Sequence, residues 1–151
     1  QFGEDVDIYD YAGHGKLTVI DLSGIWCYYC NEMAKWTEGR RSFMDDYSGT
    51  YSFIEGLPAL IESGDVQWVT ILDSDVNGQS IEVDEQMGWA TDYENDQIAI
   101  LGDVDMVLQG YLGVAGYPTV LVVDENMEIV SYNKQDYFEA LQYAYDNTTP
   151  Q

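Results

Sequence analysis

The sequence predicts an α/β fold in which helices flank a mixed β-sheet. Apolar β-branched runs alternate with segments of helical spacing over the first two-thirds of the chain, as in α/β proteins. Two strands joined by a short turn, and then a final helix, complete the chain, so part of the sheet is antiparallel. The 151 residues suit one domain, 1–151, in which residues 1–15 form a polar N-terminal arm.

The first half of the chain is predicted to contain two buried strands separated by helical segments. Residues 17–22 form a β-branched run that is apolar on both faces, as in the middle of a sheet. Over residues 28–46, apolar residues then recur at intervals of three and four residues, which predicts one helix. Residues 51–61 form a second helical piece, broken around Pro58, and residues 66–72 form the next strand.

The second half of the chain combines shorter elements. A helix, a strand and a further helix precede a glycine-containing turn, and a hairpin and a closing helix follow it. In chain order, the predicted elements are helix 81–94, strand 97–101, helix 103–111, strands 119–123 and 128–132, and helix 135–145. The connection between the last two strands has the length of a hairpin loop.

Acidic residues dominate the charge of the chain. The 28 Asp and Glu stand against 5 Lys and Arg, which gives a formal net charge of −23. Nucleic acids and anionic membrane surfaces are therefore disfavoured as partners, because both bind clustered cations. A field of this sign keeps a protein in solution and attracts cationic partners. No apolar run approaches the roughly 20 residues that a membrane-spanning helix needs.

Cys27 and Cys30, the two cysteines of the chain, follow the first buried strand and open the next helix. Free N–H groups and the helix dipole stabilise a thiolate at such a position. We expect Cys27 to be the exposed nucleophile and Cys30 to resolve a mixed disulfide. A zinc site would need further ligands, which the single histidine, His14, does not provide. An inert buried pair is the remaining alternative.

Asp21 is a candidate for proton transfer. It stands inside an apolar strand, six residues before Cys27, where burial raises the pKa of a carboxyl group toward neutrality. A carboxylate with such a pKa can accept the proton of Cys30 as that thiol attacks. A purely structural Asp at the end of a strand is the alternative interpretation.

The segment Gly116-Tyr117-Pro118-Thr119 lies directly before a β-branched strand. A proline is tolerated at the first residue of a strand because it need not donate to the ladder. A cis bond between Tyr117 and Pro118 would place the Tyr117 backbone close to the sulfurs, where it could pair with a substrate chain.

Together these features resemble the thioredoxin-like superfamily. The resemblance rests on a strand, on Trp26 followed by Cys-x-x-Cys, on a helix and on a later Gly-Tyr-Pro-Thr strand, and it covers residues 16–30 and 97–132. The strand–helix unit at 97–111 is similar to the unit that TlpA/ResA-type exported redoxins carry before their proline. The resemblance implies a thioredoxin-like fold, a mixed central sheet flanked by helices, with an extra strand–helix insertion before a cis-proline at Pro118.

The same resemblance implies a thiol–disulfide oxidoreductase. Its catalytic residues are Cys27, which attacks, Cys30, which resolves, and Asp21. Its expected substrate-binding residues are Trp26, Tyr117 and Pro118. No cofactor is expected besides the redox-active disulfide. The expected partners are disulfide-containing or dithiol proteins and an upstream redox protein that donates electrons. An exported location in the periplasm or cell envelope, after removal of a signal peptide, is expected, with a cytoplasmic location as the alternative.

Two departures from the family pattern lie in the cysteine motif and the helix that follows it. Tyr28 and Tyr29 stand between the cysteines, without the histidine that oxidants and isomerases carry there. Lys35 stands where thioredoxins have a helix-kinking proline. The missing histidine and the acidic field both disfavour a thiolate, which points to a mild or reducing potential. The reverse direction, as an oxidase or isomerase, remains open.

The loop after the second strand resembles the start of an EF-hand. Asp73, Asp75 and Asn77 stand at ligand positions 1, 3 and 5, Gly78 follows them, and Asp84 falls at the last position. The final Asp in place of Glu, and the strand before the loop, depart from that pattern, so a solvated acidic turn is the alternative. A second hypothesis for the chain is therefore an acidic binding module with a static disulfide, which binds calcium through this loop.

Overall fold

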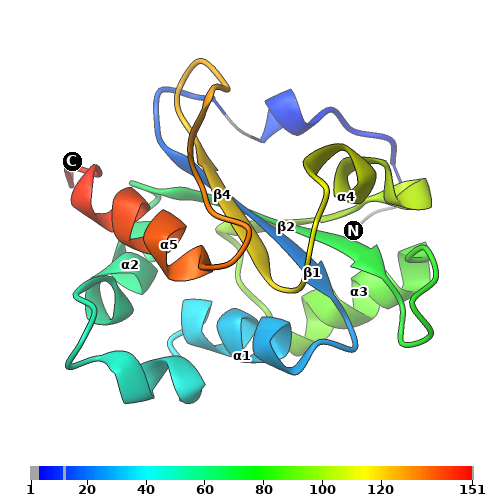
Figure 1. Cartoon of the computed structure of the whole chain (residues 1–151), viewed down its shortest axis with the longest axis horizontal. Coiled ribbons are helices and arrows are strands. Elements are labelled where there is room, and N and C mark those ends of the chain that lie inside the picture. The colour runs from blue at the N-terminus through cyan, green and yellow to red at the C-terminus, as the bar shows by residue number, and fades with distance from the viewer. Residues whose placement is uncertain (1–3, 12, 151) are drawn as a thin grey trace.

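A five-stranded mixed sheet forms the centre of the molecule (Figure 1). The computed structural model describes residues 4–11 and 13–150. The strands are β1 Thr18–Gly24, β2 Gln67–Ser74, β3 Ile98–Gly102, β4 Thr119–Val123 and β5 Ile129–Tyr132. They lie in the order β3-β2-β1-β4-β5, with β1–β2 and β2–β3 parallel and β1–β4 and β4–β5 antiparallel. This topology confirms the predicted α/β class with a mixed sheet.

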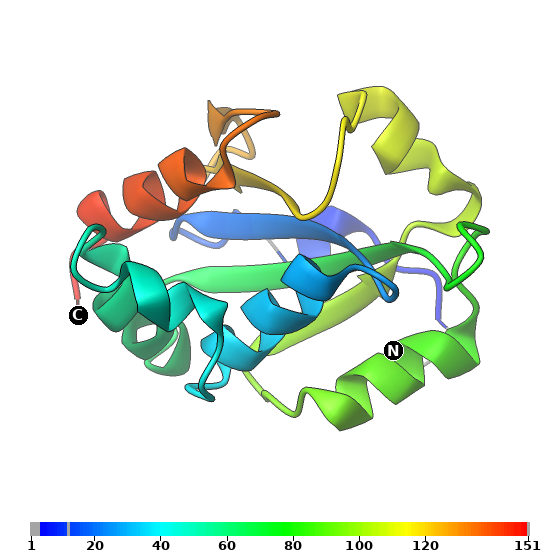
Figure 2. The same ribbon diagram turned by 60° about the horizontal axis from the view of Figure 1, so that its bottom comes forward.

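Helices cover both faces of the sheet (Figure 2). They are α1 Tyr28–Thr37, α2 Phe53–Glu62, α3 Val83–Asp92, α4 Val107–Leu112 and α5 Tyr137–Asp146. Helices α1, α2 and α5 share one core cluster with Val19, Trp68 and Val120 of the sheet. Helix α4 packs with Ile20 and Leu22. These two side chains point to the face opposite that of Val19, because side chains alternate along a strand. The sheet therefore has a thick helical layer on one face and a thinner cover on the other.

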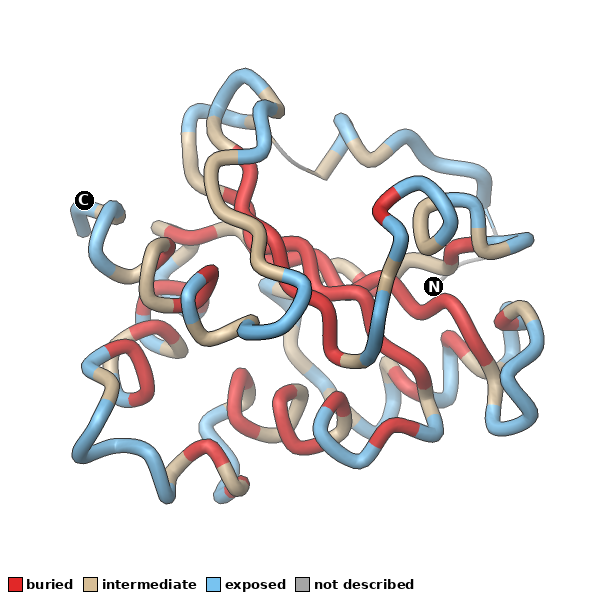
Figure 3. Tube along the Cα trace, viewed as in Figure 1, coloured by how far each residue is buried: buried red, intermediate tan, exposed pale blue. Residues whose placement is uncertain are grey.

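Burial is greatest along the central strand, as Figure 3 shows. Every residue of β1 is buried, because β1 has a strand on each side and helices above and below. A short 3-10 helix, Ile8–Asp10, begins the cover of the thinner face, where Ile8 and Tyr11 pack against the core. Residues 1–3 and 12 of the predicted N-terminal arm lie outside the described residues.

The prediction of one helix over residues 28–46 was wrong. Helix α1 ends at Thr37, and Gly39 adopts a left-handed φ of 71° that a continuing helix would not allow. A separate 3-10 helix follows at Phe43–Tyr47. Because Met44 of this second piece is also buried in the core, the apolar spacing continues past the break and conceals it.

The predicted break at Pro58 is absent, and α2 runs through this residue. Proline has no N–H, so the carbonyl of Ile54, four residues earlier, loses its helical donor. The indole Nε1–H of Trp36, in α1, donates to that carbonyl at 2.9 Å. A side chain from a neighbouring helix therefore replaces the missing backbone hydrogen bond.

The predicted helix at 103–111 is divided into two pieces. A 3-10 turn, Val104–Met106, precedes α4, and Asp103 is the residue directly before this turn. Its carboxylate accepts hydrogen bonds from the backbone N–H groups of Leu108 and Gln109, at 3.0 and 2.9 Å. This carboxylate therefore holds the first turn of α4 in place without a regular N-cap.

Replacement of Leu22 by Ala should lower the free energy of unfolding by about 2–5 kcal/mol, since Leu22 is completely buried in the central strand. Val107, on the outer side of α4, is 69% exposed, and Val107→Ala should change the same quantity by less than about 0.5 kcal/mol. Urea unfolding followed by circular dichroism measures both values. Equal losses in the two variants would contradict the described core.

Candidate functional site

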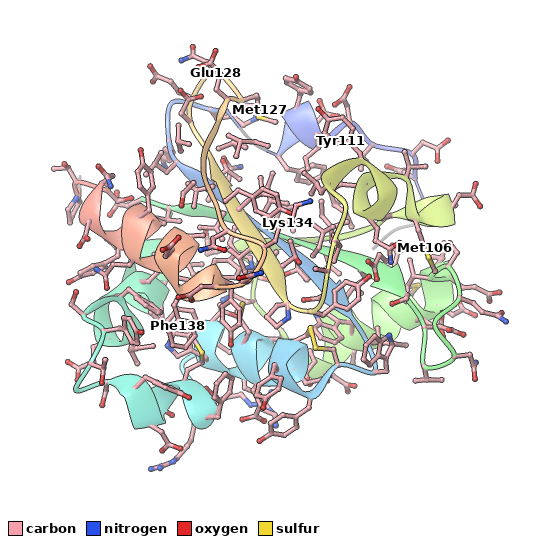
Figure 4. All side chains as sticks on the ribbon, in the orientation of Figure 1. Met106, Tyr111, Met127, Glu128, Lys134 and Phe138 are labelled. Atoms are coloured by element: carbon pink, nitrogen blue, oxygen red, sulfur yellow. A yellow bond between two sulfur atoms is a disulfide. The ribbon has the colours of Figure 1, made fainter. Side chains whose placement is uncertain are left out.

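The two cysteines lie in the turn between β1 and α1. Cys27 is the N-cap residue of α1, and its Sγ atom is bonded to that of Cys30 as a disulfide, with the two Cα atoms 5.2 Å apart (Figure 4). The backbone N–H of Cys30 donates to the Cys27 Sγ at 3.2 Å. An amide of the first helical turn therefore already points at the sulfur that would carry negative charge in the reduced pair.

The disulfide is more buried than the sequence suggested. Cys27 is 4% exposed and Cys30 is 0% exposed, so the expectation of an exposed Cys27 was wrong for the disulfide form. Both sulfurs belong to a core cluster against which the ring of Tyr117 packs. Tyr28 and Tyr29, between the cysteines, are exposed instead. The ring of Tyr117 therefore packs against the cluster of the disulfide, whereas Tyr28 and Tyr29 face the solvent.

The side chain of Asn31 stabilises the cysteine turn through hydrogen bonds to its backbone. Its Nδ2 group donates to the carbonyl of Ile25 at 3.1 Å and to the carbonyl of Cys27 at 2.7 Å. Its Oδ1 atom accepts from the hydroxyl of Tyr93, at the end of α3, at 2.6 Å. Sequence reasoning missed this residue; the available signal was an amide side chain directly after the second cysteine.

Asp21 is buried in β1, and burial raises the pKa of its carboxyl group to about 7. Hydrogen bonds from Ser23 and Thr70 act in the opposite direction, and the Ser23 hydroxyl donates to Asp21 Oδ1 at 2.9 Å. Asp21 shares a face of β1 with Val19, which packs in the same cluster as α1 residues. The carboxyl group thus lies on the side of the sheet that carries the cysteine helix, and its expected rise in pKa is present.

The structure brings together the three residues expected to bind substrate. The bond between Tyr117 and Pro118 is cis, as the family resemblance implied. The ring of Tyr117 meets that of Trp26 edge to face, with centroids 5.7 Å apart. The indole Nε1–H of Trp26 donates to the Ser74 hydroxyl, at the end of β2, at 3.0 Å. The residue before the first cysteine and the residue before the proline therefore form one aromatic unit.

The Tyr117 hydroxyl is enclosed by polar side chains. It donates to a carboxylate oxygen of Asp73, and it accepts from the Gln109 Nε2 group at 2.6 Å. Burial, and next the hydrogen bond to Asp73, raises the pKa of Tyr117 to about 12. Burial likewise raises the pKa of Asp73. The phenol therefore stays protonated and able to donate at physiological pH.

The residues of the EF-hand-like loop do not converge. Asp73 belongs to β2 and binds Tyr117, whereas the Asp75 carboxylate accepts from the backbone N–H groups of Asn77 and Gln79, which lower its pKa. Asp84 lies in the first turn of α3. Within residues 4–11 and 13–150, no three Asp, Glu, His or Cys side chains gather as a possible metal site. The loop is held by its own turn hydrogen bonds.

Comparison with known proteins finds likenesses in structure. No family model and no curated protein matches the sequence. The pneumococcal exposed lipoprotein thioredoxin Etrx1 of Streptococcus pneumoniae strain TIGR4 is 20% identical, with 92% of this chain and 89% of that chain covered and a TM-score of 0.57. A secreted Mycobacterium tuberculosis disulfide oxidoreductase homologous to E. coli DsbE is 16% identical, with coverages of 92% and 87% and a TM-score of 0.53. StoA from Bacillus subtilis is 18% identical, with coverages of 79% and 73% and a TM-score of 0.50.

These likenesses show that the chain has the thioredoxin-like fold. The matched structures include the thioredoxin domain of a Bacteroides vulgatus thiol–disulfide oxidoreductase and the disulfide oxidoreductase homologous to DsbE, in agreement with the redoxin group that the sequence resembles. In this chain β3 and α4 form the strand–helix insertion before the cis-proline. Among the described residues, no helix is long and apolar enough to cross a membrane.

Replacement of Asp21 by Asn should stabilise the protein above neutral pH. The pKa of Asp21 is raised from 3.8 to about 7, so the folded state binds its proton more tightly than the unfolded state. Stability is therefore lost as the pH rises from about 4 to about 7, by roughly 4 kcal/mol at most. Asp21→Asn should remove this loss, which urea unfolding at pH 4, 6 and 8 measures.

Asp46→Asn is the matched control for Asp21→Asn, because the Asp46 side chain is 72% exposed and the substitution removes the same charge. Its stability relative to the wild type should vary little with pH. A constant difference between Asp21→Asn and the wild type over pH 4–8 would contradict the buried, proton-binding carboxyl group.

Proposed function

We propose that this protein is a thiol–disulfide oxidoreductase that reduces disulfides in partner proteins. The observation that carries this proposal is the Cys27–Cys30 disulfide at the amino end of α1, in a thioredoxin-like fold, with the cis-proline loop at Pro118 packed beside it. Several of the similar structures are described as thiol–disulfide oxidoreductases, which supports the same chemistry here.

The first step is attack by Cys27 in the reduced protein. Its thiolate attacks one sulfur of a partner disulfide, a new bond joins Cys27 to the partner, and the partner's own S–S bond breaks. The departing partner thiolate takes up a proton. The N–H of Cys30 and the dipole of α1 stabilise the attacking thiolate at the helix start.

The second step is release by Cys30. Asp21 accepts the proton of the Cys30 thiol, and the resulting thiolate attacks the Cys27 sulfur. The mixed disulfide breaks, the second partner thiolate leaves, and the Cys27–Cys30 disulfide forms. Two electrons have passed from the cysteine pair to the partner, so an upstream dithiol redox protein must reduce the pair before the next cycle.

Substrate contact is assigned to Trp26, Tyr117 and Pro118. The rings of Trp26 and Tyr117 touch, and the loop at Pro118 leads directly into β4. In this proposal, the backbone before Pro118 pairs with an extended segment of the partner. An exported location, in the periplasm or cell envelope, is proposed because similar structures include secreted and surface-exposed proteins.

Cys27→Ser should abolish the acceleration that this protein gives to the reduction of insulin disulfides by dithiothreitol, because the attacking thiol is missing. Cys30→Ser should accumulate the mixed disulfide, since the resolving thiol is missing. Turbidity of insulin in dithiothreitol measures the first result. Mass spectrometry in the absence of reductant detects the mixed disulfide of the second. Release of substrate by Cys30→Ser at the wild-type rate would contradict the assigned roles.

The reduction potential of the cysteine pair decides the direction of electron flow. The absence of histidine between the cysteines predicts a value near −270 mV, as in thioredoxin, and not near −120 mV, as in DsbA. Equilibration with glutathione and dithiothreitol buffers measures it. A value near that of DsbA would indicate an oxidant or isomerase. A disulfide that neither reductant opens in the folded protein would instead support the acidic binding module with a static disulfide.

Asp21→Asn should slow the second step and leave the first unchanged. With a pKa of about 7, Asp21 is an effective proton acceptor only above that pH, so the rate of release should rise through pH 7 in the wild type. The variant should lose this rise. Single-turnover kinetics between pH 5.5 and 8.5 separate the two steps, and an identical pH profile in the variant would show that another group takes the proton.

A further inference from the structure

One pair of aromatic rings lies beside the buried cluster that contains the disulfide. Cys27 and Cys30 are both buried, and Tyr117 packs against the cluster that contains them. Trp26 meets the ring of Tyr117 edge to face and is 50% exposed.

Both rings are held by their polar edges at the end of β2. Asp73 accepts from the Tyr117 hydroxyl, and Ser74, the next residue, accepts from the Trp26 indole at 3.0 Å. Asp73 and Ser74 are adjacent in the chain, so one strand end anchors both rings. The indole also lies against bare backbone, because a Cβ atom at Gly24 would come within 2.8 Å of its Nε1 atom.

Stability alone does not account for an acid at position 73. The Asp73 side chain is completely buried, and its Oδ1 atom has no hydrogen-bond partner among the described residues. A buried acceptor without a partner costs about 1–3 kcal/mol, which an apolar residue of similar shape would avoid. The contact that sets Asp73 apart from such a residue is its hydrogen bond with the Tyr117 hydroxyl.

The same hydroxyl ties the rings to the strand–helix insertion. Gln109, in α4, donates to the Tyr117 hydroxyl at 2.6 Å. The backbone N–H of Gln109 in turn donates to the Asp103 carboxylate. The position of the Tyr117 ring is thus set by β2 on one side and by the insertion on the other.

We propose that Asp73 is a positioning residue, which through the Tyr117 hydroxyl holds the Tyr117 and Trp26 rings over the disulfide. Held there, the rings shield the sulfurs from small thiols and present a preformed aromatic surface to a protein substrate. Their release exposes Cys27 to any thiol and removes the surface that a protein substrate needs. The substrate half of this proposal rests on the proposed redox function, whereas the shielding half does not.

The test compares two substitutions at Asp73 with one at Tyr117. Asp73→Leu removes the acceptor and keeps the branched shape of the side chain, Asp73→Asn keeps an oxygen that can accept, and Tyr117→Phe removes the donor. In Asp73→Leu and Tyr117→Phe, the rate constant for reduction of the protein's own disulfide by dithiothreitol should rise about fivefold, as expected for loss of one hydrogen bond. Dithiothreitol supplies two electrons in this reaction and is itself oxidised to its cyclic disulfide.

The efficiency of insulin reduction, kcat/KM, should change in the opposite direction. It should fall about fivefold in Asp73→Leu and Tyr117→Phe, while Asp73→Asn stays within about twofold of the wild type in both assays. A general loss of packing would not accelerate one reaction and slow the other. Trapping of thiols with iodoacetamide, followed by mass spectrometry, gives the first rate, and turbidity gives the second.

Tyr132→Phe is the matched control. The Tyr132 hydroxyl donates to the carbonyl of Leu112 at 3.2 Å, at the carboxyl end of α4, where Lys134 also donates to Gly113 at 3.1 Å (Figure 4). The variant thus loses a tyrosine hydrogen bond to α4 and leaves the contact of Asp73 intact. Both rates should remain at the wild-type values.

The proposal is overturned if Asp73→Leu and Tyr117→Phe leave the dithiothreitol rate within twofold of the wild type, or if Tyr132→Phe raises it as much. If Asp73→Leu does not fold, Tyr117→Phe decides, because it removes a single oxygen atom. A wild type that does not reduce insulin would refute the proposed function and the substrate half of this proposal. The dithiothreitol rates would then still confirm or refute the shielding.

Discussion

The pairing of β1 with a strand on each side is the constraint on which the geometry around the disulfide depends. Gly24 of β1 pairs with Ser74 of β2, and Leu22 pairs with Thr119 of β4, directly after the cis-proline. The cysteine turn, the end of β2 and the proline loop are far apart in sequence, and they meet because one buried strand lies between their strands. A slip of β1 by one residue would exchange the faces of Asp21 and its apolar neighbours, so the register is strongly specified.

The end of the sheet next to the disulfide carries one buried carboxyl group on each face, Asp21 and Asp73. The two groups have different neighbours. Asp21 accepts from the Ser23 hydroxyl on the side of α1, whereas Asp73 accepts from the Tyr117 hydroxyl on the side of α4. Burial raises the pKa of both. Removal of a carboxyl group from water is not offset by one or two hydrogen bonds, so both acids reduce stability at neutral pH. The chain has a net charge of −23, and two buried acids add nothing to its solubility. A role beside the disulfide therefore accounts for Asp21 and Asp73 better than solubility or stability does.

Sequence patterns predicted the features that depend on neighbours along the chain and missed those that depend on contacts across it. The strands, the mixed sheet and the position of the cysteine pair at a helix start follow from local periodicity and spacing. Asn31 was missed, and Asp73 was assigned to a calcium-like loop, because their partners, Tyr93 and Tyr117, lie 62 and 44 residues away. The expected exposure of Cys27 failed for the same reason, since the buried cluster that contains Cys27 is built from distant segments, among them Leu72, Trp89 and Ile100.

The contact between α1 and α2 makes the residues tolerated at positions 36 and 58 depend on each other. Pro58 leaves the carbonyl of Ile54 without its helical donor, and the indole of Trp36 takes the place of that donor. While the proline remains, a phenylalanine at position 36 would leave a carbonyl unpaired in the core. Once the proline is replaced, the indole is no longer needed for this bond. Positions 36 and 58 are therefore expected to covary among proteins related to this chain. Which residues α1 tolerates at position 36 thus depends on Pro58, a residue of α2 that lies outside the cysteine site.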